Sequence, residues 1–191
     1  MTALIAGLIV FLGVHSVRIV ADDWRSAQIA RRGLRPWKGW YSLASALGLA
    51  LIVWGFGQAR LAPMSLWPPL PWARHLAALL MLAAFVLLVA AYVPGNRIRA
   101  RLHHPMLLGV KAWALAHLLA NHTLADLLLF GGFLLWAVFD FRAARQRDRR
   151  LHTVYPPGTT GATVVTVVVG VAAYLLFALV LHAWLFGVRP F

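Results

Sequence analysis

Long apolar runs separated by short basic stretches organise the whole chain. Six segments are apolar enough to cross a membrane: Thr2–Val20, Trp40–Phe56, His75–Val93, Pro105–Ala120, Leu124–Phe141 and Ala162–Val188. A membrane-spanning helix needs about 20 residues, within a range of roughly 17–25. The pattern therefore predicts a single all-α domain over residues 1–191, a polytopic bundle of about six transmembrane helices.

The connections between these segments refine the prediction. Only a few residues around Asn121 separate the short fourth segment from the fifth, so these two are expected to form a tight antiparallel hairpin. The run TTGATVVTVVVG (159–170) is β-branched, but in a bilayer a helix satisfies its backbone more simply than a strand. The first run lacks a basic leader and a small-residue cleavage site before Arg18, so we expect it to be retained as a helix.

Composition supports a membrane protein whose main partner is the lipid bilayer. Hydrophobic residues make up 62% of the chain and charged residues 12%, whereas soluble domains carry about 25% charged residues. A net charge of +13 in a soluble protein would indicate nucleic acid, but here the basic residues lie between apolar segments. We therefore expect no nucleic-acid partner. The absence of cysteine excludes disulfides, thiolate metal sites and a cysteine nucleophile.

The basic side chains lie in alternate connections, which predicts the orientation. Three connections hold most of them: Arg25, Arg31, Arg32, Arg35 and Lys38, then Arg97, Arg99 and Arg101, then Arg142, Arg145, Arg147, Arg149 and Arg150. The opposite side carries only Arg60, Arg74 and Arg189. Because positive loops remain in the cytoplasm, both termini are predicted to lie outside it. The run RQRDRR (145–150) is expected to be a solvated loop that anchors to lipid headgroups.

Two of the eight histidines fall within the predicted hydrocarbon region. His15 is about five residues, roughly 8 Å, from the cytoplasmic end of its helix. His117 is about twelve residues, roughly 18 Å, from the cytoplasmic end of its own helix. Ionisable groups at membrane depth are costly and usually functional. The offset of roughly 10 Å counts against a shared metal ion, although helix tilt or an inclined macrocycle would absorb it.

Two imidazoles favour haem over other metal centres. The chain has five acidic residues and no glutamate, which does not supply the ligand cluster of a zinc or di-iron site. Imidazoles from opposing helices can ligate the two faces of haem iron, here His15 and His117, with Trp113 beside the ring. Arg18 lies on the same helix face as His15 and is expected to pair with a propionate. His104 and Lys111 also share a helix face and form a second candidate propionate or headgroup site.

Other interpretations of these side chains stay open. A membrane histidine also occurs as a structural residue that bonds to the backbone or to a hydroxyl group of a neighbouring helix. Lys111 can extend to the cytoplasmic interface and keep its charge in water.

Four motifs taken in order resemble the NnrU family of bacterial inner-membrane proteins. They are HSVR (15–18), HHPML (103–107), WALAHLLAN (113–121) and LFGGFLLW (129–136). The resemblance runs from the first helix to the end of the fifth. It implies a multi-pass protein of the bacterial inner membrane with a role in denitrification and nitric oxide metabolism. The family is also homologous to 15-cis-zeta-carotene isomerase, which carries haem b and isomerises a polyene when its iron is reduced.

Carried over to this chain, the haem ligands of that isomerase correspond to His15 and His117. The resemblance thus implies bis-histidine haem b and a lipophilic substrate. The isomerase has a cysteine three residues before its second histidine, where this chain has Ala114, so a thiolate ligand switch is unavailable. His103 also replaces the usual arginine of the family, and His122-Thr123 replaces Gly-Asp. These departures put carotenoid isomerisation by that mechanism in doubt.

Two further functions fit the pattern. The chain could be a non-catalytic accessory protein for nitrite and nitric oxide reductases, with structural histidines. Membrane methyltransferases share the His-Pro-Met opening at His104, but they use a pair of glutamates near their last cytoplasmic loop. This chain has no glutamate, and its equivalent loop is RQRDRRL (145–151).

Overall fold

The computed structural model describes residues 1–190, and within that range it contains helices and no strands. The elements are α1 (Thr2–Val20), α2 (Asp22–Arg32), α3 (Leu34–Ala59), α4 (Ala73–Tyr92), α5 (Arg97–Leu102), α6 (Pro105–Ala120), α7 (Leu124–Arg150), α8 (Thr160–Leu176), the π-helical segment η1 (Phe177–Leu181) and α9 (His182–Phe186). Five helical stretches are long and apolar enough to cross a membrane, and α6 is a shorter apolar helix. The predicted all-α membrane bundle is confirmed.

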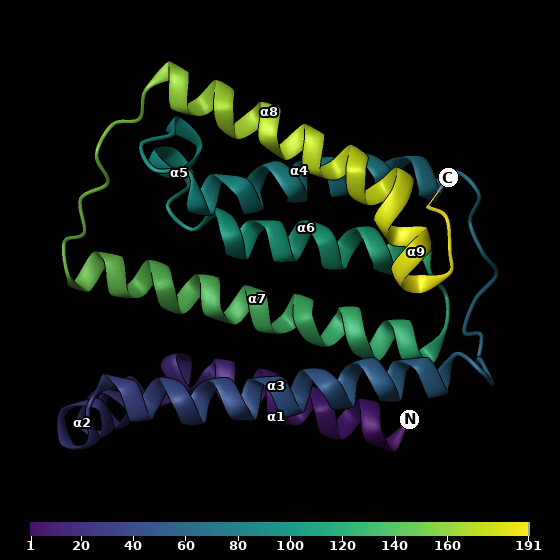
Figure 1. Cartoon of the computed structure of the whole chain (residues 1–191), viewed down its shortest axis with the longest axis horizontal. Coiled ribbons are helices and arrows are strands. Elements are labelled where there is room, and N and C mark those ends of the chain that lie inside the picture. Colours follow the sequence, from purple (N-terminus) through teal and green to yellow (C-terminus); the bar gives the residue numbers. More distant parts are fainter. Residues whose placement is uncertain (191) are drawn as a thin grey trace.

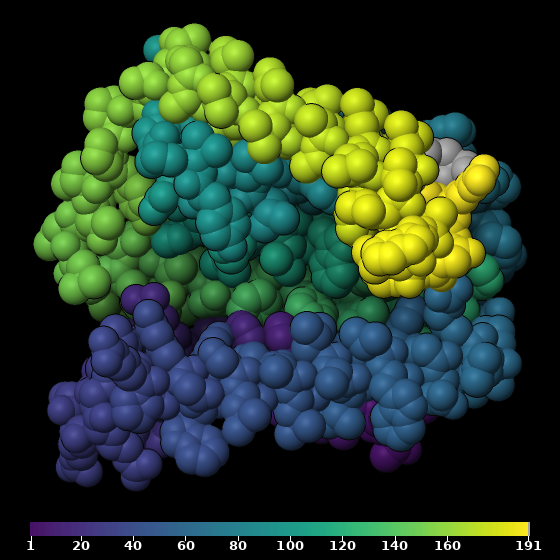
Figure 2. All heavy atoms as spheres, viewed as in Figure 1, coloured from purple at the N-terminus to yellow at the C-terminus, as the bar shows by residue number. Residues whose placement is uncertain are grey.

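The long helices pack in a layered order that differs from their order in the sequence. Figure 1 shows α8 against α4, then α6, then α7, with α1 and α3 forming the opposite edge. Thus α7 contacts α1 on one side and α6 on the other. The space-filling view shows α3 along one edge of the visible face and α8 along the other (Figure 2).

Glycines bring α1 and α3 into backbone contact. A Cβ atom at Gly7 would lie 2.6 Å from the Ile52 nitrogen, and one at Gly48 would lie 2.7 Å from the Phe11 nitrogen. A Cβ at Gly55 would overlap the backbone of Leu4. Membrane helices associate through small residues that allow such close approach, because lipid offers no hydrophobic driving force between them. These glycines therefore fix α1, and with it His15, against α3.

The two ends of the bundle differ in charge and in packing. Both termini lie at one end, while α2, α5 and the end of α7 lie at the other (Figure 1). We call the second end the basic end, because it carries the arginine-rich connections. The main buried cluster lies toward the terminal end and comprises Leu4, Leu8, Ile52, Ala59, Ala114, Ala125, Leu129 and Phe130.

Two connections that were expected to be loops are helical. The run at 145–150 continues α7 as far as Arg150, so the predicted loop is wrong there. No glycine or proline interrupts α7 after Phe141, arginine is a good helix former, and an Asp140–Arg147 pair at 3.6 Å supports the turn. The stretch after α1 also forms a helix, α2, which has acidic residues in its first turn and basic residues in its last. This arrangement complements the helix dipole.

The predicted hairpin between α6 and α7 is confirmed, and a local motif fixes it. Thr123 caps α7, and Asp126 bonds back to the Thr123 nitrogen at 3.1 Å in a capping box. The β-branched run after Thr159 is helical as predicted, and the Thr159 hydroxyl caps α8 by accepting from the Ala162 nitrogen. The last span then passes through η1 and α9 and stops at Gly187, which has a φ of 70°.

Candidate functional site

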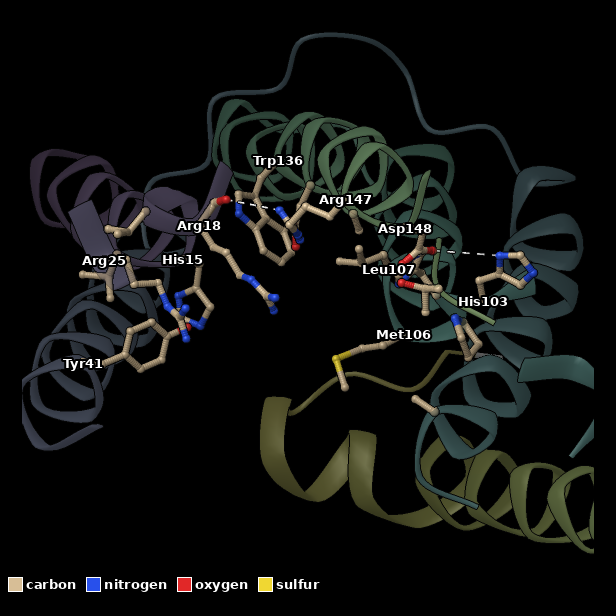
Figure 3. A pocket seen from close by; sticks show the side chains of 18 of the residues that line it. His15, Arg18, Arg25, Tyr41, His103, Met106, Leu107, Trp136, Arg147 and Asp148 are labelled. Carbon is tan, nitrogen blue, oxygen red and sulfur yellow. Dashed lines mark hydrogen bonds and ion pairs between the residues drawn. The ribbon is translucent and has the colours of Figure 1, made fainter. Parts of the chain in front are cut away.

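A cavity of about 680 Å³ opens at the basic end, between the α1–α3 pair and the remaining helices. Figure 3 shows its two walls: His15, Arg18 and Tyr41 on one side, and Met106 and Asp148 on the other. Trp136 of α7 lies between the walls. The packed cluster at the terminal end and this cavity at the basic end make the bundle dense at one end and hollow at the other.

The geometry of His15 leaves one ring nitrogen available to the cavity. Its Nδ1 lies 2.7 Å from the Phe11 carbonyl oxygen, one helical turn earlier. A carbonyl only accepts, so Nδ1 carries the hydrogen and Nε2 keeps its lone pair. The ring stacks on Phe11 with centroids 4.2 Å apart and meets Trp136 edge-on at 6.0 Å. Metal-binding histidines typically have one nitrogen fixed in this way by a carbonyl.

The walls of the cavity are strongly cationic. Five basic side chains line it against two carboxylates: Arg18, Arg25, Lys38, Arg99 and Arg147 against Asp140 and Asp148. Arg147 is held by Asp140 at 3.6 Å and donates to the Arg18 carbonyl at 3.1 Å. Arg18 itself lies 3.8 Å from Asp22. A cavity with this excess of positive charge favours a ligand that carries carboxylate or phosphate groups.

The Trp136 indole supplies an unused hydrogen-bond donor in the same place. Its Nε1 is buried and has no hydrogen-bond partner among residues 1–190. Buried N–H groups are almost always paired, so an unpaired one calls for an explanation such as an absent ligand. Because Trp136 lines the cavity beside His15, a hydrogen-bond acceptor on a bound ligand would satisfy this N–H donor.

A second polar cluster lies on the α6–α7 wall, around Asp148. His104 Nε2 lies 2.7 Å from Asp148 Oδ2, and the Tyr155 hydroxyl donates to the same oxygen at 3.0 Å. His103 stacks on Tyr155 with centroids 4.1 Å apart and bonds to Arg145. Burial and the bond to Asp148 both raise the pKa of Tyr155. The sequence predicted a role for His104. It did not predict one for Asp148, which lies in an arginine-rich run, or for Tyr155, which lies in the loop after α7.

The structure places His117 away from the cavity and near the terminal end. Its Nδ1 also bonds to a carbonyl, that of Trp113 at 2.9 Å, and its ring stacks on Phe130 at 4.4 Å. By contrast, the His15 ring contacts Trp136. The two histidines therefore contact α7 at residues six positions apart, which is about 9 Å along the helix.

Metal–imidazole bonds are about 2 Å long, so two ligands of one iron bring their nitrogens within roughly 4 Å. The described conformation does not bring His15 and His117 together in this way. A chain of aromatic contacts through Phe11, Phe133 and Trp113 connects the two imidazoles, with successive centroids of these three rings 5.7 and 5.4 Å apart.

Lys111 and Trp113, the two remaining candidate residues, are not among the residues that line the cavity. Lys111 places its Nζ 3.9 Å over the Phe141 ring, a cation–π contact toward the basic end. His104 meets the edge of the same ring at 6.0 Å, so the two polar residues share a neighbour. Trp113 packs among Phe130 and Phe133 as part of the core.

The potential metal ligands of the chain and its comparison with known proteins limit the functions that can be proposed. Within residues 1–190, no group of three or more histidine, cysteine, aspartate or glutamate side chains could hold a metal ion alone. A model of the family described as NnrU protein matches residues 3–190, which is nearly the whole chain. No curated protein and no solved structure matches the chain.

Proposed function

Because this chain belongs to the NnrU family, we propose that it is a haem b-binding protein of the bacterial inner membrane. The proposed cofactor site is the cavity at the basic end, where His15 would bind the iron. The observation that supports this most directly is the fixed imidazole of His15, whose Nε2 is unbonded beside a cationic cavity.

The residues of the cavity fit an amphiphilic tetrapyrrole with carboxylate groups. His15 would bind the iron through Nε2, and Trp136 would donate its unpaired N–H to an acceptor of the ligand. Arg18 and Lys38 would pair with the propionates. His117 would be a structural residue, since its ring is packed between Trp113 and Phe130.

Haem b, when bound, would supply an iron that changes its oxidation state and can bind a small molecule. Such a site would serve redox-gated isomerisation of a polyene or a step in nitric oxide metabolism. The cavity residues would have the same roles in both functions. The basic side chains would orient the ligand through its carboxylates, and the Phe11 carbonyl sets the tautomer of His15.

Absorption spectra of the purified full chain, produced with added haem precursor, test this proposal. We expect a Soret band that His15→Ala shifts or removes and that His117→Ala leaves in place. His75→Ala, at the terminal end, serves as a matched control for histidine loss. Loss of the band in both His15→Ala and His117→Ala would overturn the single-ligand arrangement and favour a bis-histidine site. Absence of haem from the unmodified chain would overturn the proposal and favour the accessory role.

A further inference from the structure

The cluster around Asp148 has the arrangement of an acid–base pair rather than that of a haem ligand. His104 and Asp148 both line the cavity, on the wall opposite His15, and their side chains are 20% and 16% exposed. The Asp148 oxygen is close to two donors, His104 Nε2 at 2.7 Å and the Tyr155 hydroxyl at 3.0 Å. A carboxylate held by two donors stays an acceptor, so the hydrogen lies on His104 Nε2 and the lone pair on Nδ1.

An unusual turn builds this cluster. His103 has a φ of 67° and a ψ of −50°, and the His104 nitrogen donates to the Leu102 carbonyl at 2.8 Å. These values describe a γ-turn of the rare, strained kind, here at a residue that is not glycine. Pro105 then starts α6 and holds His104 outside the helical region. The turn directs both adjacent imidazoles toward one carboxylate, since His103 Nδ1 lies 4.0 Å from Asp148.

Strained backbone at a cavity wall is most often kept for a function. We propose that His104 is an acid–base residue and that Asp148 is its positioning residue. The cavity is lined by apolar and cationic side chains, so the ligand class is an amphiphile whose polar head lies in the cavity. His104 Nδ1 would take a proton from a hydroxyl group or a water molecule at that head. This inference concerns the chain with no haem in the cavity, and it does not rest on the proposed haem site.

The proton transfer balances without a further reactant. The O–H bond of the hydroxyl or water breaks, its electron pair stays on oxygen, and an N–H bond forms at His104 Nδ1. Asp148 remains a carboxylate and stabilises the resulting imidazolium through the Nε2–H bond. The oxygen's electron pair then bonds to an electrophilic atom of the ligand and displaces a leaving group, and the imidazolium gives its proton to that group or to water at the basic end. Other charged or titratable neighbours of the pair are His103, Tyr155, Arg145 and Arg99, the last two lying near Tyr155.

A structural alternative is that the cluster only ties the segment after α7 to the start of α6. The two roles differ in whether His104 reacts. The probe is 4-nitrophenyl decanoate, an uncharged amphiphilic ester, offered to the full chain in detergent. Water activated by His104 would attack the ester carbonyl, and the C–O bond would break to release 4-nitrophenolate and decanoate.

We expect the chain to hydrolyse the probe about 100-fold faster than the His104→Gln variant, the lower end of general-base effects. Asp148→Asn should slow hydrolysis as well, because the imidazolium loses its partner. His152→Gln, a change at another histidine of the basic end, should leave the rate unchanged. Equal rates in the unmodified chain and in His104→Gln would overturn the proposal.

A measurement on the unmodified chain guards against variants that fail to fold. Diethyl pyrocarbonate attaches to an imidazole nitrogen that carries a lone pair, and mass spectrometry locates the product. We expect His104 to react at least about tenfold faster than the packed His117. Protection of His104 to the level of His117 would show a purely structural tie and overturn the acid–base role. Neither assay requires bound haem, so a missing Soret band and an unreactive His104 are separate results.

Discussion

Replacing Gly48 by alanine should separate α1 from α3 and disturb His15 at the same time. The new Cβ would lie 2.7 Å from the Phe11 nitrogen and 2.9 Å from its Cβ. Ordinary contact needs about 3.4 Å or more, so the Phe11 backbone must move by roughly 0.7 Å. Overpacking of this kind costs about 1–3 kcal/mol, against a helix-propensity gain of about 0.5–1 kcal/mol.

Gly57→Ala is the matched control, because it lies in the same helix and its Cβ would meet nothing within 4 Å. It should gain the propensity term alone, so the two variants should differ by about 2 kcal/mol in unfolding free energy. Thermal unfolding in one detergent, followed by helical circular dichroism, measures this difference. Because the Phe11 carbonyl fixes His15, the Gly48→Ala variant should also bind haem more weakly. Equal stability of both variants would refute the close-packing argument.

Three further predictions concern single polar groups. Asn96, 1% exposed, caps α5 and donates to the Ala90 and Val93 carbonyls, so Asn96→Ala should lower the unfolding free energy by about 2–4 kcal/mol in denaturant titrations. Trp136→Phe keeps an aromatic ring but removes the unpaired donor, and should weaken ligand binding about fivefold in spectral titrations. Tyr155 has a raised pKa, so its stabilising effect should persist below pH of about 10 and disappear as the pH rises through the native value; absorbance at alkaline pH should show this shift reduced in Asp148→Asn.

Hydrophobic patterning predicted the spans, because bilayer thickness and backbone satisfaction leave few choices for an apolar run of this length. Even the β-branched run at 159–170 followed this rule and is helical. The patterning did not predict that α7 continues to Arg150, because a polar stretch without apolar positions gives no signal for a helix. Helix propensity and the Asp140–Arg147 pair account for the extension.

The candidate site was predictable only in part. His15, Arg18 and His104 lie around one cavity, whereas residue depth had grouped His15 with His117. Their partners depend on tertiary contacts between residues far apart in the sequence: Asp148 meets His104 across 44 positions, and Trp136 meets His15 from another helix. The separation of His15 and His117 depends on how α1 and α6 are staggered against α7. Residue depth predicted the difference in level between the two histidines. It did not predict the aromatic contacts of Phe11, Phe133 and Trp113 that connect them.

The layered order of the bundle has a mechanical consequence. Two groups of helices, which we call leaves, meet on α7: one is the α1–α3 pair and the other is α6 with α4 and α8. The α7 helix is 27 residues, or about 40 Å, long. If the leaves pivot at the first turn of α7, about 30 Å along this helix from Ala144 beside the hollow, each degree of rotation changes the width there by roughly 0.5 Å. A few degrees would therefore admit molecules of different thickness without rearranging any side chain at the pivot.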